Sequence, residues 1–343
     1  MSNIEGFKRL KQDIKENSIG NCYILYGEET YLRDYYFRKI KEILVPKAFE
    51  EFNYRVFEGN KLDINSLESA VDALPMMASR TMIVVKDFDF FKAAEGIRSK
   101  ITSLLNDIPE YCCLVFVFDT IEYKSDGRMK KLSDAVKNNA CTVEFVKQKQ
   151  SDMLPWIRRA FREYGHDIDK TNSEYLLFLC GGLMTNLRSE IEKISSCTES
   201  KIITEKDIDS VVTPVTEAVV FDLTDALARG EADRAVKVLA DLFALKEEPI
   251  KLVSLICSQM RGLYLAALAA ENGKTPTQLA EMMNYKSEYP ARRLLESAKL
   301  RDADSWLKAI KLSAEANIEM KRTGVDRQAL LTTLVIRLGT GNT

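Results

Sequence analysis

Short apolar runs alternate with amphipathic stretches along the first part of the chain. Such runs, when bounded by polar turns, are typical of strands that are buried on both faces of a sheet. Between them apolar residues recur at helix spacing, as Leu32, Tyr36 and Ile40 do in the first stretch. This alternation predicts an α/β domain with a mostly parallel, five-stranded sheet. The predicted strands are 22–27, 54–59, 81–87, 113–118 and 141–146, and the helices that follow the first one are 64–73, 92–107 and 126–138.

Beyond residue 147 the pattern is helical, and we expect no further strands. Ser151 is predicted to cap the first of these helices, and Thr204 and Thr275 begin segments with capping-box spacing. The pattern predicts three domains joined by short connections. They are an α/β domain at 1–147, a small helical domain at 148–212 and an all-helical domain at 213–343.

Composition and charge narrow the class of protein only a little. The 343 residues are 46% hydrophobic and 29% charged, with a formal net charge of −2, as in a soluble globular protein. Near-neutral charge gives no overall attraction to nucleic acid or membranes. The 7 cysteines, an odd number set mostly in apolar runs, indicate reduced thiols and a cytoplasmic protein. The N-terminal segment does not resemble a secretion signal, and no membrane span is expected.

The turn after the first predicted strand is where a phosphate-binding loop would lie. A Walker A loop needs a second glycine followed by Lys and Ser or Thr, but here Gly27 is followed by Glu28 and Glu29. Two carboxylates would repel a polyphosphate, so nucleotide binding in the usual mode is not expected. Asp87 and Asp119, which follow other strands, are interpreted as solvated strand ends.

Other catalytic or metal-binding chemistry is not apparent. The single histidine, His166, lies in a polar turn and cannot supply a histidine metal cluster. No cysteine set has metal-binding spacing, and we expect no catalytic, cofactor-binding or metal-binding residues. The densest basic clusters, at 128–131 and 320–324, are interpreted as solvated helix faces or ends because no aromatic residues are interleaved with them.

The segment "DALPMMASR", residues 72–80, raises a separate question. The helix before it is predicted to bury Leu67 and Leu74 on one face and to end at Pro75. Met76 and Met77 then stand in a turn before the third strand. Ordinary core filling is the interpretation that periodicity alone favours, whereas flexible, polarizable methionines in a turn could also form an apolar plug for a partner.

Several sequence blocks in this order resemble the delta-subunit family of bacterial DNA polymerase III clamp loaders. They span nearly the whole chain, and the resemblance implies a fold like that of AAA+ and RecA ATPases without ATP hydrolysis by this subunit. The blocks are "YILYGEETYLRD", "ASRTMIVVKD", "LPWI", "LRSEIEKI", "VFDLTDALARGEADRAVKVLADL", "EEPIKLVSLICSQMRGLYLA" and "EMKRTG".

The resemblance also implies a binding element for the β sliding clamp. In that family a hydrophobic pair, typically Leu-Phe just before "ASR", enters a pocket of the ring-shaped clamp and helps to open the ring. Met76 and Met77 occupy these positions here, with Leu74 beside them. The chain departs from the family pattern in having methionine in place of the aromatic residue, and Asp72 where Gln is often found.

The remaining expectations follow from the same resemblance. Residues 148–212 would form a lid-type domain, and residues 213–343 a collar that holds the tau/gamma ATPases and delta prime. Lys321 and Arg322 would lie nearest the primed DNA. The resemblance implies a cytoplasmic replisome protein with no cofactor and no membrane partner, in a holoenzyme where another subunit performs nucleotidyl transfer. Two alternatives remain open: a divergent AAA+ NTPase, and a scaffold subunit with little clamp contact.

Overall fold

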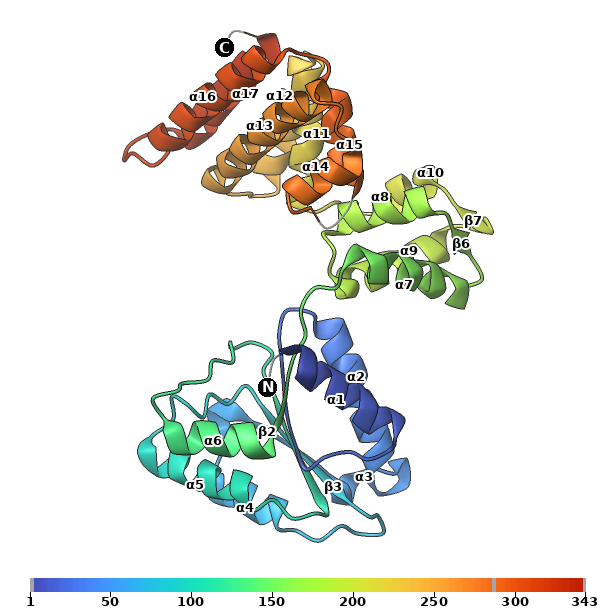
Figure 1. Ribbon diagram of the computed structural model, residues 1–343, viewed down its shortest axis with the longest axis vertical. Coiled ribbons are helices and arrows are strands. Elements are labelled where there is room, and N and C mark those ends of the chain that lie inside the picture. Colours follow the sequence, from blue (N-terminus) through green and yellow to red (C-terminus); the bar gives the residue numbers. More distant parts are fainter. Residues whose placement is uncertain (1–2, 286–287, 342–343) are drawn as a thin grey trace. The chain divides into compact units, whose positions relative to one another are not determined.

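The structure, a computed structural model, describes residues 3–285 and 288–341. The chain divides into two compact units, Met1–Lys147 and Gln148–Thr343, each with its own hydrophobic core. In Figure 1 the first unit, coloured blue to green, is built around a sheet, and the second consists mainly of helices. The predicted boundary at residue 212 lies within the second unit, so the division of that unit into two domains stays a prediction.

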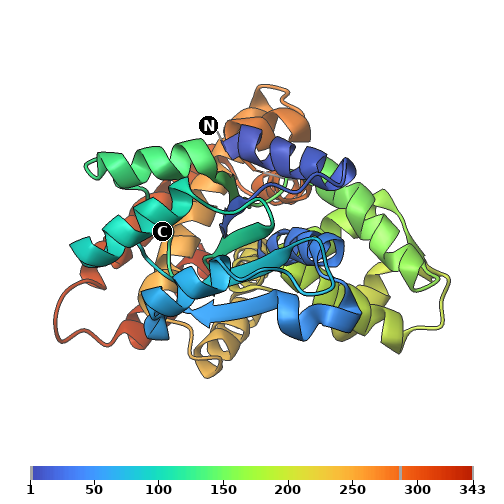
Figure 2. The same ribbon diagram turned by 90° about the horizontal axis from the view of Figure 1, so that it is seen from below.

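The first unit contains the predicted parallel sheet of five strands, in the order β2-β3-β4-β1-β5. Strand β2 therefore forms one edge; in Figure 2 it is the blue strand that lies outermost. The connection from β1 to β2 crosses the sheet in one direction, and the later connections, from β2 to β5, lead back in the other. Right-handed connections in two directions place helices on both faces of the sheet. The strands are β1 Cys22–Tyr26, β2 Tyr54–Glu58, β3 Thr81–Lys86, β4 Cys112–Val117 and β5 Cys141–Glu144.

Helices cover both faces of this sheet, as Figure 1 shows. Successive residues of a strand point to opposite faces. Cys112 therefore lies in the hydrophobic cluster with α4, α5 and α6, whereas Cys113 lies in the cluster with α1 and α2. This double burial explains the continuous apolar runs of β1, β3 and β4, whereas the edge strand β2 is mostly exposed. The elements are α1 Asn3–Lys15, α2 Thr30–Leu44, η1 Lys47–Phe49, α3 Glu50–Asn53, η2 Gly59–Lys61, α4 Ile64–Val71, α5 Glu95–Asn106 and α6 Lys130–Asn139.

Helix α4 ends earlier than the sequence pattern predicts. Its last residue is Val71, and Asp72 closes it by donating its backbone N–H to Glu68. Leu74, predicted to be buried on this helix, is 76% exposed. The prediction was wrong because Pro75 disfavours helical geometry at the residue before it, so Leu74 leaves the helical face.

In the residues of the second unit that the structure describes, 148–285 and 288–341, the fold is helical apart from one pair of short strands. The expectation of no further strands was wrong, since β6 Asp167–Ile168 pairs in parallel with β7 Ile202–Ile203. Two residues are too few to leave an apolar run in the sequence. Helix α7 begins at Gln150 with Lys149 as its N-cap, not at the predicted cap Ser151. The first helices are α7 Gln150–Glu163, α8 Lys170–Cys180, α9 Met184–Cys197 and α10 Glu205–Val211.

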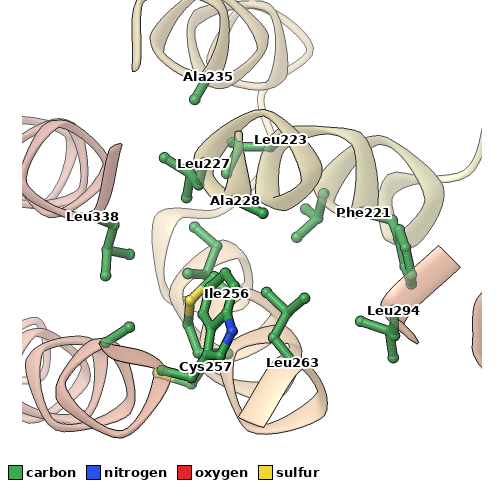
Figure 3. Packing of buried hydrophobic residues seen from close by; sticks show 14 of the residues in the cluster. Phe221, Leu223, Leu227, Ala228, Ala235, Ile256, Cys257, Leu263, Leu294 and Leu338 are labelled. Atoms are coloured by element: carbon green, nitrogen blue, oxygen red, sulfur yellow. The ribbon is translucent and has the colours of Figure 1, made fainter. Parts of the chain in front are cut away.

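The later helices of this unit share one apolar core, in which Figure 3 shows Leu227, Ile256 and Leu338 converging from three of them. Helix α13 is long and apolar enough to cross a membrane by length and composition, but much of it is buried in this core. Both predicted capping boxes, at Thr204 and Thr275, are present. The helices are α11 Thr216–Ala228, α12 Ala232–Ala244, α13 Pro249–Glu271, α14 Pro276–Met282, α15 Glu288–Ala298, α16 Ala303–Glu319 and α17 Arg327–Thr340.

Candidate functional site

The loop between α4 and β3, residues 72–80, presents three apolar side chains to solvent. Leu74 is 76% exposed, Met76 is 52% exposed and Met77 is 75% exposed. The core-filling interpretation of the two methionines is therefore wrong. Three neighbouring apolar side chains on one loop are more than the scattered exposure that is normal for a protein surface.

The backbone of this loop is fixed by a buried amide. Asn53, at the end of α3, has no exposed surface. Its Oδ1 accepts the backbone N–H of Met76 at 2.7 Å, and its Nδ2 donates to the carbonyl of Met76 at 2.8 Å and to that of Phe49 at 3.0 Å. Both N–H groups of the amide are thus used, and only one orientation of the amide satisfies all three contacts.

The two ends of the loop are tied down as well. At the first end, the Tyr111 hydroxyl donates to the carbonyl of Asp72 at 3.0 Å. At the other end, the Arg80 guanidinium donates to groups just before β1 and at the first residue of β4, which anchors the loop to the amino edge of the sheet. Its acceptors are the carbonyls of Ile19, Gly20 (3.1 Å) and Cys112 (2.9 Å) and the Asn21 Oδ1 (2.8 Å).

Met77 has an unusual backbone conformation. Its φ is +54°, in the left-handed region that costs an L-residue about 1–2 kcal/mol. Such a conformation persists where the surroundings determine it, and here the contacts at Asn53 and Arg80 do so. The turn lets two adjacent methionines both remain exposed.

The loop after β1, where a phosphate would bind in a related ATPase, is closed against β5. The Glu29 N–H donates to the carbonyl of Phe145 at 2.9 Å. Gly27 has a φ of +118°, and a Cβ there would lie 2.7 Å from the backbone nitrogen of Phe145. Glu29 is itself completely buried. This short, packed turn has neither the length nor the charge to enclose a polyphosphate.

The aspartates at the neighbouring strand ends have structural partners. Asp87 accepts the backbone N–H groups of Asp119 at 2.7 Å and Thr120 at 3.0 Å. Burial raises the pKa of Asp87, but these hydrogen bonds and the one from the Thr120 hydroxyl lower it by more. The pKa of Asp87 therefore lies below its usual value. Asp119 pairs with the nearly buried Arg33 at 2.8 Å. Asp119 is exposed and Asp87 partly exposed, as expected of strand ends, and each also binds protein groups.

The other candidate residues lie in separate parts of the fold. Lys321 and Arg322 are exposed in the turn after α16, in the second unit. His166 contacts the carbonyl of Ser200 through Nδ1 at 2.7 Å, next to the short strand pair. Of the cluster at 128–131, Arg128 pairs with Asp126. In the described parts of the chain, no group of three or more His, Cys, Asp or Glu residues could hold a metal ion.

Sequence reasoning missed the residues that hold the loop. Asn53 and Tyr111 lie 23 and 39 positions from the backbone groups they bind, and neither belongs to a recognisable motif. The local hint in the sequence is an asparagine directly before strand β2. Such a residue can be assigned a role only when the folded neighbours are known.

A parallel sheet of this order, with a closed turn after β1 and a following helical unit, defines the class of AAA+-like proteins without a Walker A loop. A family model for "DNA polymerase III, delta subunit" matches residues 23–146, and one for the "DNA polymerase III delta subunit, C-terminal domain" matches residues 217–338. Together they cover more than half of the chain. The chain belongs to this family, the clamp loader delta subunits of DNA polymerase III.

Individual relatives agree with this assignment along most of the chain. DNA polymerase III subunit delta of Bacillus subtilis (strain 168) is 25% identical over 335 residues, which cover 95% of each protein. The probable DNA polymerase III subunit delta of Aquifex aeolicus (strain VF5) is 25% identical over 275 residues, covering 78% of this chain and 76% of the relative.

Among solved structures, the Bacillus subtilis DNA clamp loader delta protein (YqeN) has the same fold. The TM-score is 0.50 with 22% identity, and the match covers 96% of this chain and 98% of that one. At this level of identity the match supports the fold rather than any individual contact.

Proposed function

We propose that this clamp loader subunit binds the β sliding clamp with the side chains of Leu74, Met76 and Met77 and helps to open the ring for loading onto primed DNA. The observation that supports this most is their exposure on a loop whose backbone is tied down. Exposed apolar side chains on a fixed backbone can enter an apolar pocket with little ordering cost. The methionines would adapt to a pocket that other family members fill with an aromatic side chain.

The subunit would not hydrolyse ATP itself, and other loader subunits would supply that energy. The packed turn at Gly27 and the buried Glu29 support this part of the proposal against the alternative of a divergent AAA+ NTPase. In the DNA polymerase III holoenzyme, nucleotidyl transfer would belong to a different subunit. The site of action would be the cytoplasmic replisome.

The helical segment at 213–343 would serve as the collar that joins the tau/gamma ATPases and delta prime, and 148–212 as the lid-type domain. Lys321 and Arg322, exposed in the turn after α16, would be the collar residues nearest DNA. Cations there would bind phosphates without reading sequence. The second alternative, a scaffold with little clamp contact, would use the collar alone.

Clamp binding is tested by changing Met76 and Met77 to alanine together. Burial of two methionines contributes roughly 3–5 kcal/mol before ordering costs, so we expect affinity for the cognate clamp to fall at least tenfold, by about 1.4 kcal/mol or more. The thermal transition should stay in place because both side chains are largely exposed.

Met282→Ala is a matched control, because Met282 is another exposed methionine, at 62%, in the second unit. It should leave clamp affinity unchanged. If the double variant bound the clamp like the original protein, the scaffold alternative would replace this proposal. Removal of residues 72–80 would then leave a clamp pull-down unaffected too.

A further inference from the structure

We propose that Asn53 is a positioning residue, which holds the loop 72–80 in the conformation that presents its apolar side chains to the clamp. This inference rests on the proposed function. Asn53 does not offer a surface to any partner, since its side chain has no exposed area. Any effect of Asn53 on binding must therefore act through the loop.

The amide of Asn53 substitutes for a backbone partner at Met76. A peptide group offers one donor and one acceptor, and Asn53 meets both at Met76, as a neighbouring strand would. No shorter side chain can do this, and a carboxylate lacks the donor. The loop is therefore held by two hydrogen bonds at its centre, at the first of the two exposed methionines.

Asn53 is itself held in place by contacts of its own short helix. Lys41 of α2 forms an ion pair with Glu50 of α3 at 2.5 Å, and its ammonium lies 3.9 Å from the ring centre of Tyr54. These contacts hold the short helix α3 between α2 and the start of β2. The second hydrogen of the Asn53 amide is bound to Phe49, which sets the direction of the side chain.

The expected consequence is a larger fraction of molecules in the binding conformation. When only a fraction of a protein is competent to bind, its apparent affinity falls in proportion to that fraction. Loss of the Asn53 contact would lower this fraction before the clamp arrives, so association would slow. Dissociation would change little, because the contacts in the complex are unaltered. Loss of the methionines would instead speed dissociation, because it removes contacts in the complex itself.

The test compares Asn53→Ala with the original full-length protein in binding to the cognate clamp. We expect association to slow about tenfold, with the dissociation rate within about twofold. Hydrogen exchange of the Met76 amide should accelerate, because its acceptor is removed. Asn139→Ala is the matched control: its amide also donates to two acceptors, Asn106 and Ala135, but it lies before β5 at the other edge of the sheet. It should leave both rates unchanged.

Tyr111→Phe provides a second, milder variant in case Asn53→Ala fails to fold. It removes only the hydroxyl that holds the carbonyl of Asp72, and should slow association about two- to threefold. Unchanged association in the folded Asn53→Ala protein would overturn the inference alone. If that variant does not fold, unchanged association in Tyr111→Phe would overturn it, because it would show that fixing the loop backbone does not assist binding. If the original protein did not bind the clamp, the proposed function would fall and this inference with it.

Discussion

Two loops of the same sheet differ in what they turn outward. The loop after β1, at Gly27–Glu29, lies at the carboxyl edge, where ligands usually bind in open α/β sheets, and it is closed by backbone contacts to Phe145. The loop before β3, residues 72–80, lies at the amino edge and exposes Leu74, Met76 and Met77.

The difference teaches that the usual place for a site in this architecture is not where this chain keeps its candidate site. At the carboxyl edge, Glu29 and Arg33 are buried, and Arg33 donates to the carbonyl of Phe118 and pairs with Asp119. At the amino edge, polar residues also turn inward, but they bind the loop backbone and leave its apolar side chains free to contact a partner. Backbone contacts thus close one loop, whereas polar side chains hold the backbone of the other.

Gly27→Ala should have the largest effect on stability. The added methyl group would collide with the backbone of Phe145, and the alanine residue would have to adopt a positive φ. Overpacking and strain together should lower the free energy of unfolding by about 2–4 kcal/mol. Urea unfolding of the full chain measures this. Gly96→Ala is the control, because nothing lies within 4 Å of a Cβ there. Equal stability of the two variants would contradict the closed turn.

Arg80→Ala should have the next largest effect, and it should change both stability and clamp association. It leaves three backbone carbonyls without their guanidinium donor, which should lower the free energy of unfolding by about 1–3 kcal/mol. Clamp association should slow as well, because one end of the loop is released. The two readouts are thermal melting and binding kinetics. A loss of stability with unaltered association would mean that Arg80 supports the sheet and not the loop.

Leu74→Ala should separate binding from stability. Its side chain is more exposed than that of Met76, so the free energy of unfolding should change by less than about 0.5 kcal/mol. Clamp affinity should fall about three- to fivefold if Leu74 contributes a partly buried contact in the complex. Leu300→Ala, at another exposed leucine (52%), should alter neither property. A destabilised Leu74→Ala protein would restore the predicted helix packing.

ATP titration of the isolated subunit should give the smallest effect of all. We expect no saturable binding at millimolar ATP with Mg²⁺, because the turn at Gly27–Glu29 has no lysine and the Glu29 N–H is already bound to Phe145. Isothermal calorimetry measures this directly. Saturable binding that Gly27→Ala abolished, while Gly96→Ala retained it, would favour the divergent NTPase.

The sheet could be predicted well because its signals are local. The central strands β1, β3 and β4 carry continuous apolar runs, and burial on both faces of the sheet makes such runs necessary. The helix caps at Thr204 and Thr275 were equally readable, since the interacting groups are three residues apart. The pair β6 and β7 was missed because two residues per strand produce no periodic signal and the partners are far apart in the chain.

By itself, the sequence determined the five strands, the absence of a Walker A loop and the position of two methionines before the third strand. Only the tertiary structure decided that Leu74 and both methionines face solvent, and that Asn53 binds Met76 across 23 positions. Periodicity reports which residues could share a face, but whether that face is covered depends on neighbours brought together by folding. The backbone of the exposed loop is fixed by hydrogen bonds from residues that are distant in sequence, and no local pattern encodes them.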